Sequence, residues 1–527
     1  MQSTSRRSLI EISATSSRVY ASPFADVTVD GEFTAPSGAV IRHPGFYDGE
    51  GTWKLRFSPG ETGRWRYRIL STPADEGLAG EGTFEVIEAE ARGFLRSEPG
   101  STTGFRFENG EDIYLLGDTT YDLFGMDYCD GDVAGFVNRR AEQGYNLLRI
   151  RVPVSRFHPP IGHCEWQTKR CWPWGGSEQS PRFDLFNLDW FRSVDRTVQT
   201  IGVAGMGIEM IMEAWGFEFP FNHRAWFTAE HEALWLRYLI ARYDAYPQVY
   251  FWTPLNEYEY HTNGDWNWKP AADRWALSIA RWIKATAAHG HPVAMHNGPV
   301  MPPFAERFRA DPGAVDTIMF QCWGARDEDS GWLATGIDTQ IAESLENWHG
   351  TAILAEWGYE RDDAVDPLFP AFEFCDRNHN RRGGWRGAFS GLCVTNGFEF
   401  TWSPSMILDR DLPGASDLSH IRSFMSALGA HGRPVPVASV TGAEVAGTQP
   451  LALAAGEAFA VYLPAGGDAT LAAPGNYALR WFDPREGTYG PQLPVVASEG
   501  RVVLHSPGGT DAKGRPLDWA AELVRGY

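Results

Sequence analysis

The sequence predicts an α/β protein in which a (β/α)8 TIM barrel is flanked by an N-terminal Ig-like β-sandwich and a C-terminal β-sandwich. Short alternating strands separated by Gly, Pro and Asp fill residues 10–88 and recur after about residue 432. Between them, strand and helix patterns alternate, and eight such strands are the number that closes a (β/α)8 barrel. We therefore expect three domains, at residues 1–90, 91–430 and 431–527.

The first sandwich is predicted by four runs of β-branched and aromatic residues, at positions 27–29, 52–57, 64–69 and 83–86. A stretch from Glu90 to Ser101, containing Gly, Pro and Ser, is the expected linker. The second sandwich is predicted by strand patterns at 459–463, 477–482 and 501–504, between Gly- and Pro-rich turns.

Eight apolar runs provide the predicted barrel strands, and helical patterns such as 230–243 and 272–288 fall between them. The strands are expected at 113–116, 146–152, 206–212, 249–252, 292–295, 317–320, 352–355 and 391–394. Glu257 and Glu356, which follow the fourth and seventh runs, are 99 positions apart. Three βα units of roughly 30 or more residues each account for that separation.

Composition excludes several classes of protein. A net charge of −21 and a pI near 5.1 argue against nucleic-acid and anionic-membrane partners, which require basic patches. Six cysteines without a CxxC pair imply no disulfide framework. The 22 tryptophans fit either core packing or stacking on sugar rings.

No run of about 20 apolar residues predicts a membrane span. The basic N-terminus is followed only by Leu9 and Ile10 before Glu11 interrupts the apolar pattern, so we expect a cytoplasmic protein. An export signal removed from the chain would leave the same pattern.

Two carboxylates at strand tips carry the predicted chemistry. Asn256 and Glu257 follow the run 249–252, and Glu356 follows the run 352–355. Barrel enzymes place catalytic groups at these carboxyl ends. Cleavage of a glycosidic bond needs one carboxylic acid to protonate the leaving oxygen and one carboxylate to attack the sugar or activate water. An isolated Asn-Glu pair is typical of surface or capping chemistry, and the second glutamate makes catalysis the favoured interpretation.

Together these residues resemble the catalytic signature of the clan-A retaining glycoside hydrolases. The opening strand Gly117–Tyr121 and the flanking domains are similar to the apiosidase-like branch of that clan. The resemblance implies that Glu257 is the general acid/base and Glu356 the nucleophile. It also implies that Asn256 binds the hydroxyl beside the reacting carbon. Tyr121 and Asp118 on the opening strand are expected near the sugar, with loop capping as the alternative for Asp118.

Arg149 and Arg151 share strand parity, so both side chains are expected to point toward the barrel mouth. The phrase from Gly144 to Arg149 resembles the second strand of the clan, whose arginine lies near the nucleophile and keeps it ionised. An ion pair inside the barrel is the alternative interpretation.

The remaining candidates also follow predicted strands. His296 follows strand five, and Trp323, Trp357 and Trp402 are stacking platforms or packing residues. Many clan members carry a His or Tyr after strand six, where this chain has Gln321-Cys322-Trp323. His296 or Tyr359 could provide the missing support for the nucleophile. Glu213, after strand three, is a rival carboxylate.

The insertion at 153–181 is expected to narrow the mouth of the barrel with Trp166, Trp172 and Trp174. His158, His163, Cys164 and Cys171 in this insertion match no familiar zinc spacing, so we expect no metal and no cofactor.

The sequence therefore predicts a retaining glycosidase that removes a terminal sugar from a small glycoside or oligosaccharide by double displacement. Retention requires carboxyl groups about 5–5.5 Å apart, against about 6.5–9.5 Å for inversion. An endo-acting polysaccharide hydrolase and a non-catalytic carbohydrate-binding protein on a degenerate barrel are the alternatives. Sugar identity, anomer and homo-oligomerisation stay open.

Overall fold

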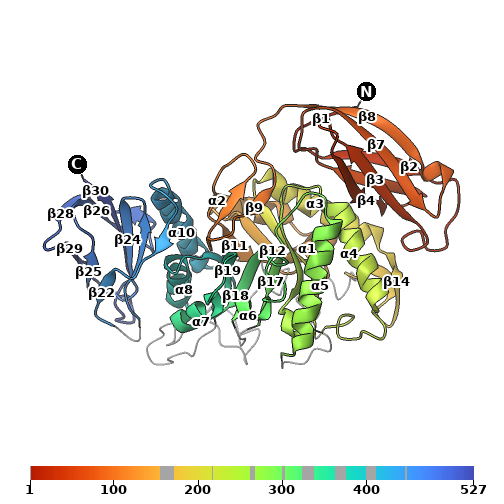
Figure 1. Cartoon of the computed structure of the whole chain (residues 1–527). Coiled ribbons are helices and arrows are strands. Elements are labelled where there is room, and N and C mark those ends of the chain that lie inside the picture. The colour runs from red at the N-terminus through yellow and green to blue at the C-terminus, as the bar shows by residue number, and fades with distance from the viewer. Residues whose placement is uncertain are drawn as a thin grey trace.

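The computed structural model contains a central α/β unit with a β-rich lobe at each of two opposite ends (Figure 1). It describes residues 2–154, 171–216, 218–261, 268–298, 303–322, 337–361, 375–398, 401, 411–444 and 448–526. Trp323, Trp402, Trp166, His158, His163 and Cys164 therefore lie outside the described residues.

Eight parallel strands form the central sheet, in the order β16-β15-β12-β11-β20-β19-β18-β17. They are β11 (Leu116–Thr119), β12 (Leu147–Arg151), β15 (Gly207–Trp215), β16 (Val249–Asn256), β17 (Ala294–His296), β18 (Thr317–Gln321), β19 (Thr351–Glu356) and β20 (Cys393–Asn396). A parallel bridge between Trp252 of β16 and Val293, just before β17, joins the first and last strands of this order. The sheet thus closes, and the predicted barrel is confirmed.

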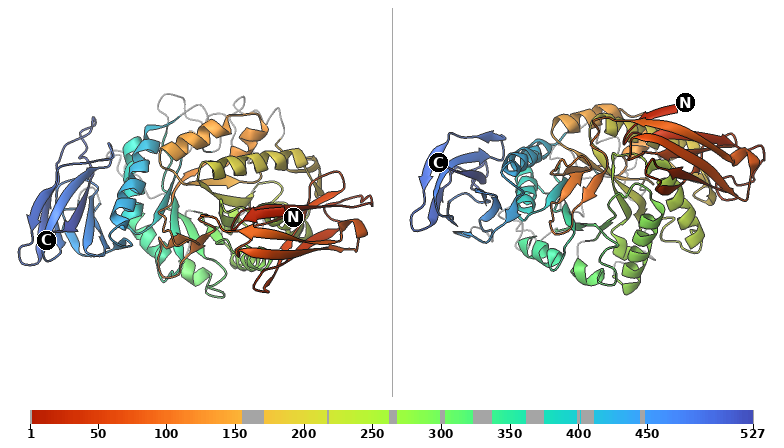
Figure 2. Two further views of the ribbon diagram at one scale, coloured as in Figure 1. Left: turned by 90° about the horizontal axis from the view of Figure 1, so that it is seen from above. Right: turned by 45° about the horizontal axis from the view of Figure 1, so that its top comes forward.

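Helices cover the outside of the barrel (Figure 2). They are α1 (Leu123–Tyr128), α2 (Val133–Glu142), α3 (Leu188–Val203), α4 (Ala229–Tyr243), α5 (Pro270–Thr286), α6 (Phe304–Arg307), α7 (Ile337–Leu345), α8 (Arg377–Phe389) and α10 (Pro413–Gly429). α3 shows the local cause: Asn187 caps its N-terminus by accepting hydrogen bonds from two backbone amides, and an apolar stripe including Trp190 and Val194 is buried. None of the described helices is long and apolar enough to cross a membrane.

The N-terminal lobe is a sandwich of two sheets, ordered β1-β8-β7-β3-β4 and β2-β6-β5. The strands are β1 (Gln2–Ser5), β2 (Ile10–Thr15), β3 (Thr28–Thr34), β4 (Val40–Pro44), β5 (Phe46–Tyr47), β6 (Thr52–Phe57), β7 (Gly63–Thr72) and β8 (Gly80–Ile87), and η1 (Glu76–Leu78) precedes β8. Both sheets contribute to one core, which includes Trp53 and Trp65. Arg56 of this lobe and Arg242 of α4 both bind Asp195 of α3, at 2.9 and 2.8 Å.

A hairpin of β9 (Leu95–Ser97) and β10 (Phe105–Phe107) lies between the first lobe and the barrel. Its residues Leu95, Phe105 and Phe107 pack with strand residues such as Leu147 and Phe251 in a separate buried cluster. Leu147 begins its strand, so this hairpin covers the amino-terminal end of the barrel. The polar residues at the strand tips lie at the opposite, carboxyl-terminal end of the barrel.

The C-terminal lobe contains two further sheets, and the larger one packs on α8 and α10 through β23 and β24. The larger has the order β21-β23-β24-β30-β26-β27 with β28 on β26, and the smaller is β22-β25-β29. The strands are β21 (Val435–Pro436), β22 (Val440–Gly442), β23 (Leu451–Ala455), β24 (Ala458–Leu463), β25 (Asp468–Ala472), β26 (Asn476–Asp483), β27 (Thr488–Tyr489), β28 (Leu493–Val496), β29 (Arg501–His505) and β30 (Trp519–Arg525). Buried Asp518 anchors this lobe by accepting hydrogen bonds from Arg381 of α8 and from Tyr462.

Candidate active site

Glu257 lies at a sharp turn between β16 and the short helix η3 (Tyr258–Tyr260). Its backbone is left-handed, with φ of 55°, a conformation that costs a non-glycine residue on the order of 1–3 kcal/mol. Gln321, the last residue of β18, donates a hydrogen bond of 2.6 Å from Nε2 to Oε1 of Glu257. The carboxylate is thereby held between the carboxyl ends of β16 and β18.

Glu356 is the last residue of β19 and is buried. The hydroxyl of Tyr121 donates a hydrogen bond of 2.7 Å to Oε1 of Glu356. Nη1 of Arg149, on β12, lies 3.4 Å from the same oxygen. Tyr359 also lowers the pKa of Glu356. Burial raises the pKa of Glu356, and these neighbours oppose that effect by favouring its ionised form.

Asn256 connects the two strand tips. Its Oδ1 accepts a hydrogen bond of 3.1 Å from Nη2 of Arg149 and lies 3.4 Å from the hydroxyl of Tyr121. Arg149 and Tyr121 thus contact both Asn256 and Glu356. Among the described residues, the buried Nδ2 of Asn256 has no hydrogen-bond partner, so this amide keeps a donor for a ligand.

His296, the last residue of β17, contacts the backbone of Glu257 and faces the carboxylate of Glu356. Its Nδ1 accepts a hydrogen bond of 3.3 Å from the backbone N–H of Glu257. The neutral ring therefore carries its proton on Nε2, which is 3.6 Å from Oε1 of Glu356. Burial, assisted by the charge of Arg149, lowers the pKa of His296 well below its usual value, so the imidazole stays neutral.

The two carboxyl groups differ in their electrostatic surroundings. Burial raises the pKa of Glu257 well above its usual range, and the charges of Glu356 and Glu259 raise it further. Burial also raises the pKa of Glu356, but Arg149 and the hydroxyl of Tyr121 oppose this effect. Two carboxyl groups with unequal proton affinity are the arrangement in which one serves as an acid and the other as a carboxylate.

Both predicted arginines lie inside the barrel. Nε of Arg149 donates to Oε2 of Glu209 at 2.8 Å, so Arg149 forms a buried ion pair in addition to its contact with Glu356. The Arg151 guanidinium pairs with Asp122 at 3.2 Å and lies 4.3 Å from the centre of the Tyr121 ring. Arg151 therefore packs against the ring of Tyr121, and Tyr121 in turn binds Glu356.

Asp118 is placed differently from its predicted role. The Asp118 carboxylate accepts a hydrogen bond of 2.5 Å from Nε of Arg140, on helix α2. Arg140 in turn contacts Asp411 at 2.6 Å. Both Asp118 and Arg140 are buried. This placement favours an ion pair between the barrel and its helical layer over a contact with a sugar.

Trp357 and Glu213 also face structural partners. The Trp357 indole is 1% exposed and donates a hydrogen bond of 2.9 Å to the carbonyl of Asn380 in α8. This favours packing over stacking on a sugar. Glu213 is buried and accepts a hydrogen bond of 3.2 Å from Arg224, which also binds Glu232. Glu213 thus belongs to an ion-pair cluster at the end of β15.

One described cluster has metal-ligand chemistry: the donor atoms of His43, Asp244 and His289 lie within 4.8 Å of one another. The hydrogen bonds argue against an ion there. Nε2 of His289 accepts from the backbone N–H of Ser58, so its Nδ1 carries the proton that binds Asp244 at 2.7 Å. The cluster is therefore a hydrogen-bond junction between the first lobe and the barrel.

A closed barrel whose fourth strand is followed directly by Glu257, and whose seventh strand ends in the buried Glu356, is the architecture of a glycosidase, and this is the class of the protein. The chain belongs to the apiosidase-like family, whose catalytic domain matches residues 102–430. A domain of unknown function, DUF5060, matches residues 6–72. Among curated proteins, none matches the chain.

Solved structures share this fold. A candidate glycoside hydrolase from Bacteroides vulgatus ATCC 8482 is 16% identical, with a TM-score of 0.71 over 99% of this chain and 100% of that one. A glycoside hydrolase family 5 protein from the same organism is also 16% identical, with a TM-score of 0.59 over 82% of this chain and 94% of that one. At these identities the likeness concerns the three-part fold.

Proposed function

We propose that the chain is a retaining glycosidase in which Glu356 is the nucleophile and Glu257 the acid/base. The observation that carries this proposal is the shared network at the strand tips. Tyr121 and Arg149 contact both Asn256 and Glu356, while His296 contacts the backbone of Glu257 and faces Glu356.

The reaction has two steps. Glu356 attacks the anomeric carbon and forms a glycosyl ester, while Glu257 transfers its proton to the departing oxygen. The ester removes the negative charge of Glu356, which had raised the pKa of Glu257. Glu257, now without its proton, therefore stays ionised and takes a proton from the water that hydrolyses the ester, which releases the sugar and restores the Glu356 carboxylate. The free Nδ2 of Asn256 supplies a donor to the adjacent sugar hydroxyl.

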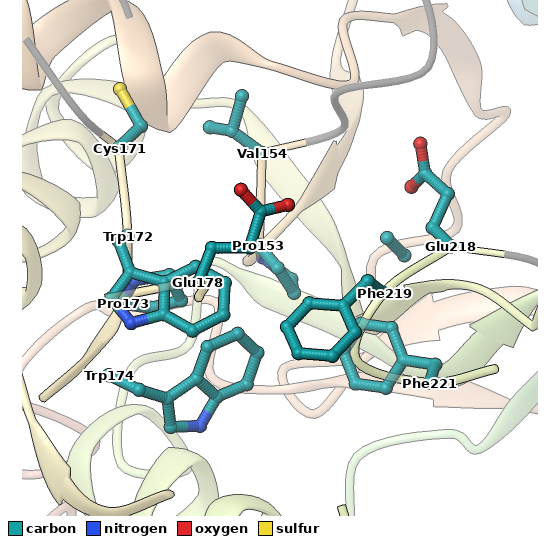
Figure 3. Close-up of a pocket in the computed structure, with 11 residues that line it drawn as sticks. Pro153, Val154, Cys171, Trp172, Pro173, Trp174, Glu178, Glu218, Phe219 and Phe221 are labelled. Carbon is teal, nitrogen blue, oxygen red and sulfur yellow. The ribbon is translucent and has the colours of Figure 1, made fainter. Parts of the chain in front are cut away.

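We also propose that the enzyme acts on a terminal sugar of a small glycoside or oligosaccharide. The support is the described part of the insertion after β12, whose Trp172 and Trp174 line a pocket together with Pro153 and Ala214 at the ends of β12 and β15 (Figure 3). An open groove for a polymer chain would need more room.

The test is hydrolysis of α- and β-anomeric aryl pyranosides and furanosides by the wild type and by Glu257→Gln and Glu356→Gln. We expect release from one sugar, lost in both variants, and NMR should show that the first product keeps the substrate's anomeric configuration. Inversion would overturn the retaining mechanism. Full activity in either variant would overturn the assignment of the pair.

A further inference from the structure

We propose that Cys129 and Cys171 are a redox-active pair that forms an intramolecular disulfide bond by exchange with a small-molecule disulfide. Their Sγ atoms lie 3.7 Å apart, and both side chains are thiols in the structure. A disulfide brings two sulfurs to about 2.05 Å, a distance that rotation about the two Cα–Cβ bonds can close. Cys129 directly follows α1, and Cys171 precedes the hairpin of β13 (Trp174–Ser177) and β14 (Ser180–Phe186). The bond would therefore fasten this hairpin to the helical layer of the barrel.

A close approach over the last turn of α1 brings the two sulfurs together. Sγ of Cys171 lies 3.9 Å from the carbonyl oxygen of Gly125. The backbone N–H of Cys129 donates a hydrogen bond of 3.0 Å to the same oxygen. A Cβ at Gly125 would lie 2.7 Å from Cγ2 of Val154 and 3.6 Å from Sγ of Cys171, so glycine permits this approach. The sulfur of Cys171 points away from the ring of Trp174 (Figure 3).

Asn187 holds the two segments together without a disulfide. Its Nδ2 donates hydrogen bonds to the hydroxyl of Tyr128, at 3.4 Å, and to the carbonyl of Trp172, at 3.1 Å. Its backbone N–H donates a hydrogen bond of 2.9 Å to the carbonyl of Pro173. Tyr128 and Trp172 are the chain neighbours of the two cysteines, so the two thiols are kept close before they react. This preorganisation lowers the entropic cost of closing the bond.

The other cysteines that the structure describes are poorly placed for exchange. Cys322, Cys375 and Cys393 are buried, whereas Cys129 and Cys171 are partly exposed. The thiolate is the attacking form of a cysteine. Burial raises the pKa of Cys322, and it raises the pKa of Cys393 to about 12, so both stay protonated at neutral pH. Among the described cysteines, exchange should therefore be confined to the proposed pair.

The exchange has two steps. The thiolate of one cysteine attacks a sulfur of the small-molecule disulfide, which forms a mixed disulfide and releases one small thiolate. The thiolate of the other cysteine then attacks the protein sulfur of the mixed disulfide and releases the second small thiolate. The two protons that the cysteines lose end on the two released thiols. The protein is thus oxidised by two electrons, and the small-molecule disulfide is reduced by two.

The first test maps the bond. The native protein is incubated with oxidised glutathione or with dithiothreitol, the remaining thiols are alkylated, and the chain is digested with trypsin. Cys129, Cys164 and Cys171 fall in the separate tryptic peptides 107–139, 157–169 and 171–182. Mass spectrometry should show peptides 107–139 and 171–182 joined after oxidation and separate after reduction. A link that contains peptide 157–169, or glutathione adducts without any joined peptide, would overturn the proposal.

The second test measures what the bond does to stability. A cross-link between positions 42 apart restricts the unfolded chain, so the Tm of the oxidised wild type should exceed that of the reduced protein by about 5 °C or more. Cys129→Ser and Cys171→Ser should each lose the joined peptide and this rise in Tm. Cys164→Ser is the matched control and should keep both.

Each protein is compared with its own reduced form, which removes the effect of the substitution itself. Equal Tm values for oxidised and reduced wild type, or a rise that persists in Cys171→Ser, would overturn the fastening of the hairpin. Neither test measures hydrolysis, so a failure here is distinguishable from a failure of the proposed function.

Discussion

The hydroxyl of Tyr121 donates a hydrogen bond of 2.7 Å to Oε1 of Glu356. Burial raises the pKa of Tyr121 well above 10, and the neighbouring charge of Glu356 adds to this effect. The phenol therefore keeps its proton at neutral pH, and it remains a donor to the carboxylate.

Tyr121→Phe should lower kcat by roughly 10- to 100-fold, because a hydrogen bond to a charged group contributes about 1.5–3 kcal/mol. It should also move the acidic limb of the kcat/KM profile to higher pH, since Glu356 loses a group that lowers its pKa. The measurement is the pH profile of kcat/KM for the wild type and for Tyr121→Phe. Tyr114→Phe, which removes a hydroxyl bonded to the carbonyl of Leu392 at 2.8 Å, is the control. An unmoved acidic limb would contradict this role of Tyr121.

Glu356→Gln should lower the pKa of Glu257, because the charge of Glu356 raises it in the wild type. Fewer Glu257 side chains would then be protonated at a given pH. NMR titration of 13C-labelled glutamate carboxyls measures the shift. Glu360→Gln removes another buried carboxyl, whose own pKa is raised to about 8, and should leave the titration of Glu257 unchanged. Equal titration curves in wild type and Glu356→Gln would show that the two carboxyls do not interact.

Arg149→Met should destabilise the fold by about 3–5 kcal/mol, because it leaves the buried Glu209 without its cation. Adding Glu209→Gln should recover much of the lost unfolding free energy. Activity should stay low in the double variant, since Glu356 still lacks its arginine. Urea unfolding and kcat/KM together check the prediction. Recovery of activity in the double variant would mean that Arg149 is only a structural partner of Glu209.

Asp518 should stabilise the attachment of the C-terminal lobe in a pH-dependent manner. Although burial opposes ionisation, Arg381, Arg382 and Arg485 lower the pKa of Asp518 well below its usual range. A carboxyl with a lowered folded-state pKa stabilises the fold above its unfolded pKa, about 3.9, and loses this contribution as the pH falls.

Asp518→Asn should therefore lower the free energy of unfolding at pH 7 by about 3–5 kcal/mol, because it breaks the buried ion pairs with Arg381 and Arg382. Its stability should also depend less on pH below 4 than that of the wild type. Thermal unfolding at pH 7 and pH 3 measures both effects. Asp468→Asn, in an exposed pair with His505, is the control and should change little. Equal losses of unfolding free energy in Asp518→Asn and Asp468→Asn would show that a buried ion pair contributes no more here than an exposed one.

The barrel was predictable because its strands are buried on both faces and read as continuous apolar runs. Each of the eight predicted strands overlaps an observed one, including the short β17 (Ala294–His296) and β20 (Cys393–Asn396), although the first, expected at 113–116, shares only Leu116 with β11. Positions at the strand tips were predictable for the same reason, since polar residues directly follow these runs. Glu257 and Glu356 come from such tips.

The partners of the tip residues were not predictable, because they depend on which way each side chain points and on distant pairing. Glu209 lies in the middle of a strand pattern, and only the register with β12 brings it to Arg149. Asp118 shares its strand with Thr119, but it is Thr119 that faces Arg149, so Asp118 faces α2. Gln321 departs from the clan pattern after strand six, and its side chain donates a hydrogen bond to the carboxylate of Glu257.

Trp357 illustrates a signal that was present in the sequence. A Cβ at Gly383 would lie 2.1 Å from Cδ1 of Trp357, so only glycine allows the indole to pack this closely on α8. Glycines at 383 and 384 in an otherwise helical stretch indicated a close approach there, without indicating which side chain makes it.

The left-handed backbone of Glu257 lowers the stability of the fold at the residue that we propose as the acid/base. Glycine adopts that conformation without steric cost, so a lineage released from selection for hydrolysis would become more stable by replacing this glutamate with glycine. Relatives that bind sugars without cleaving them should then drift toward glycine or asparagine at this turn. The residue at position 257 would thus indicate whether a descendant of this barrel still hydrolyses its substrate.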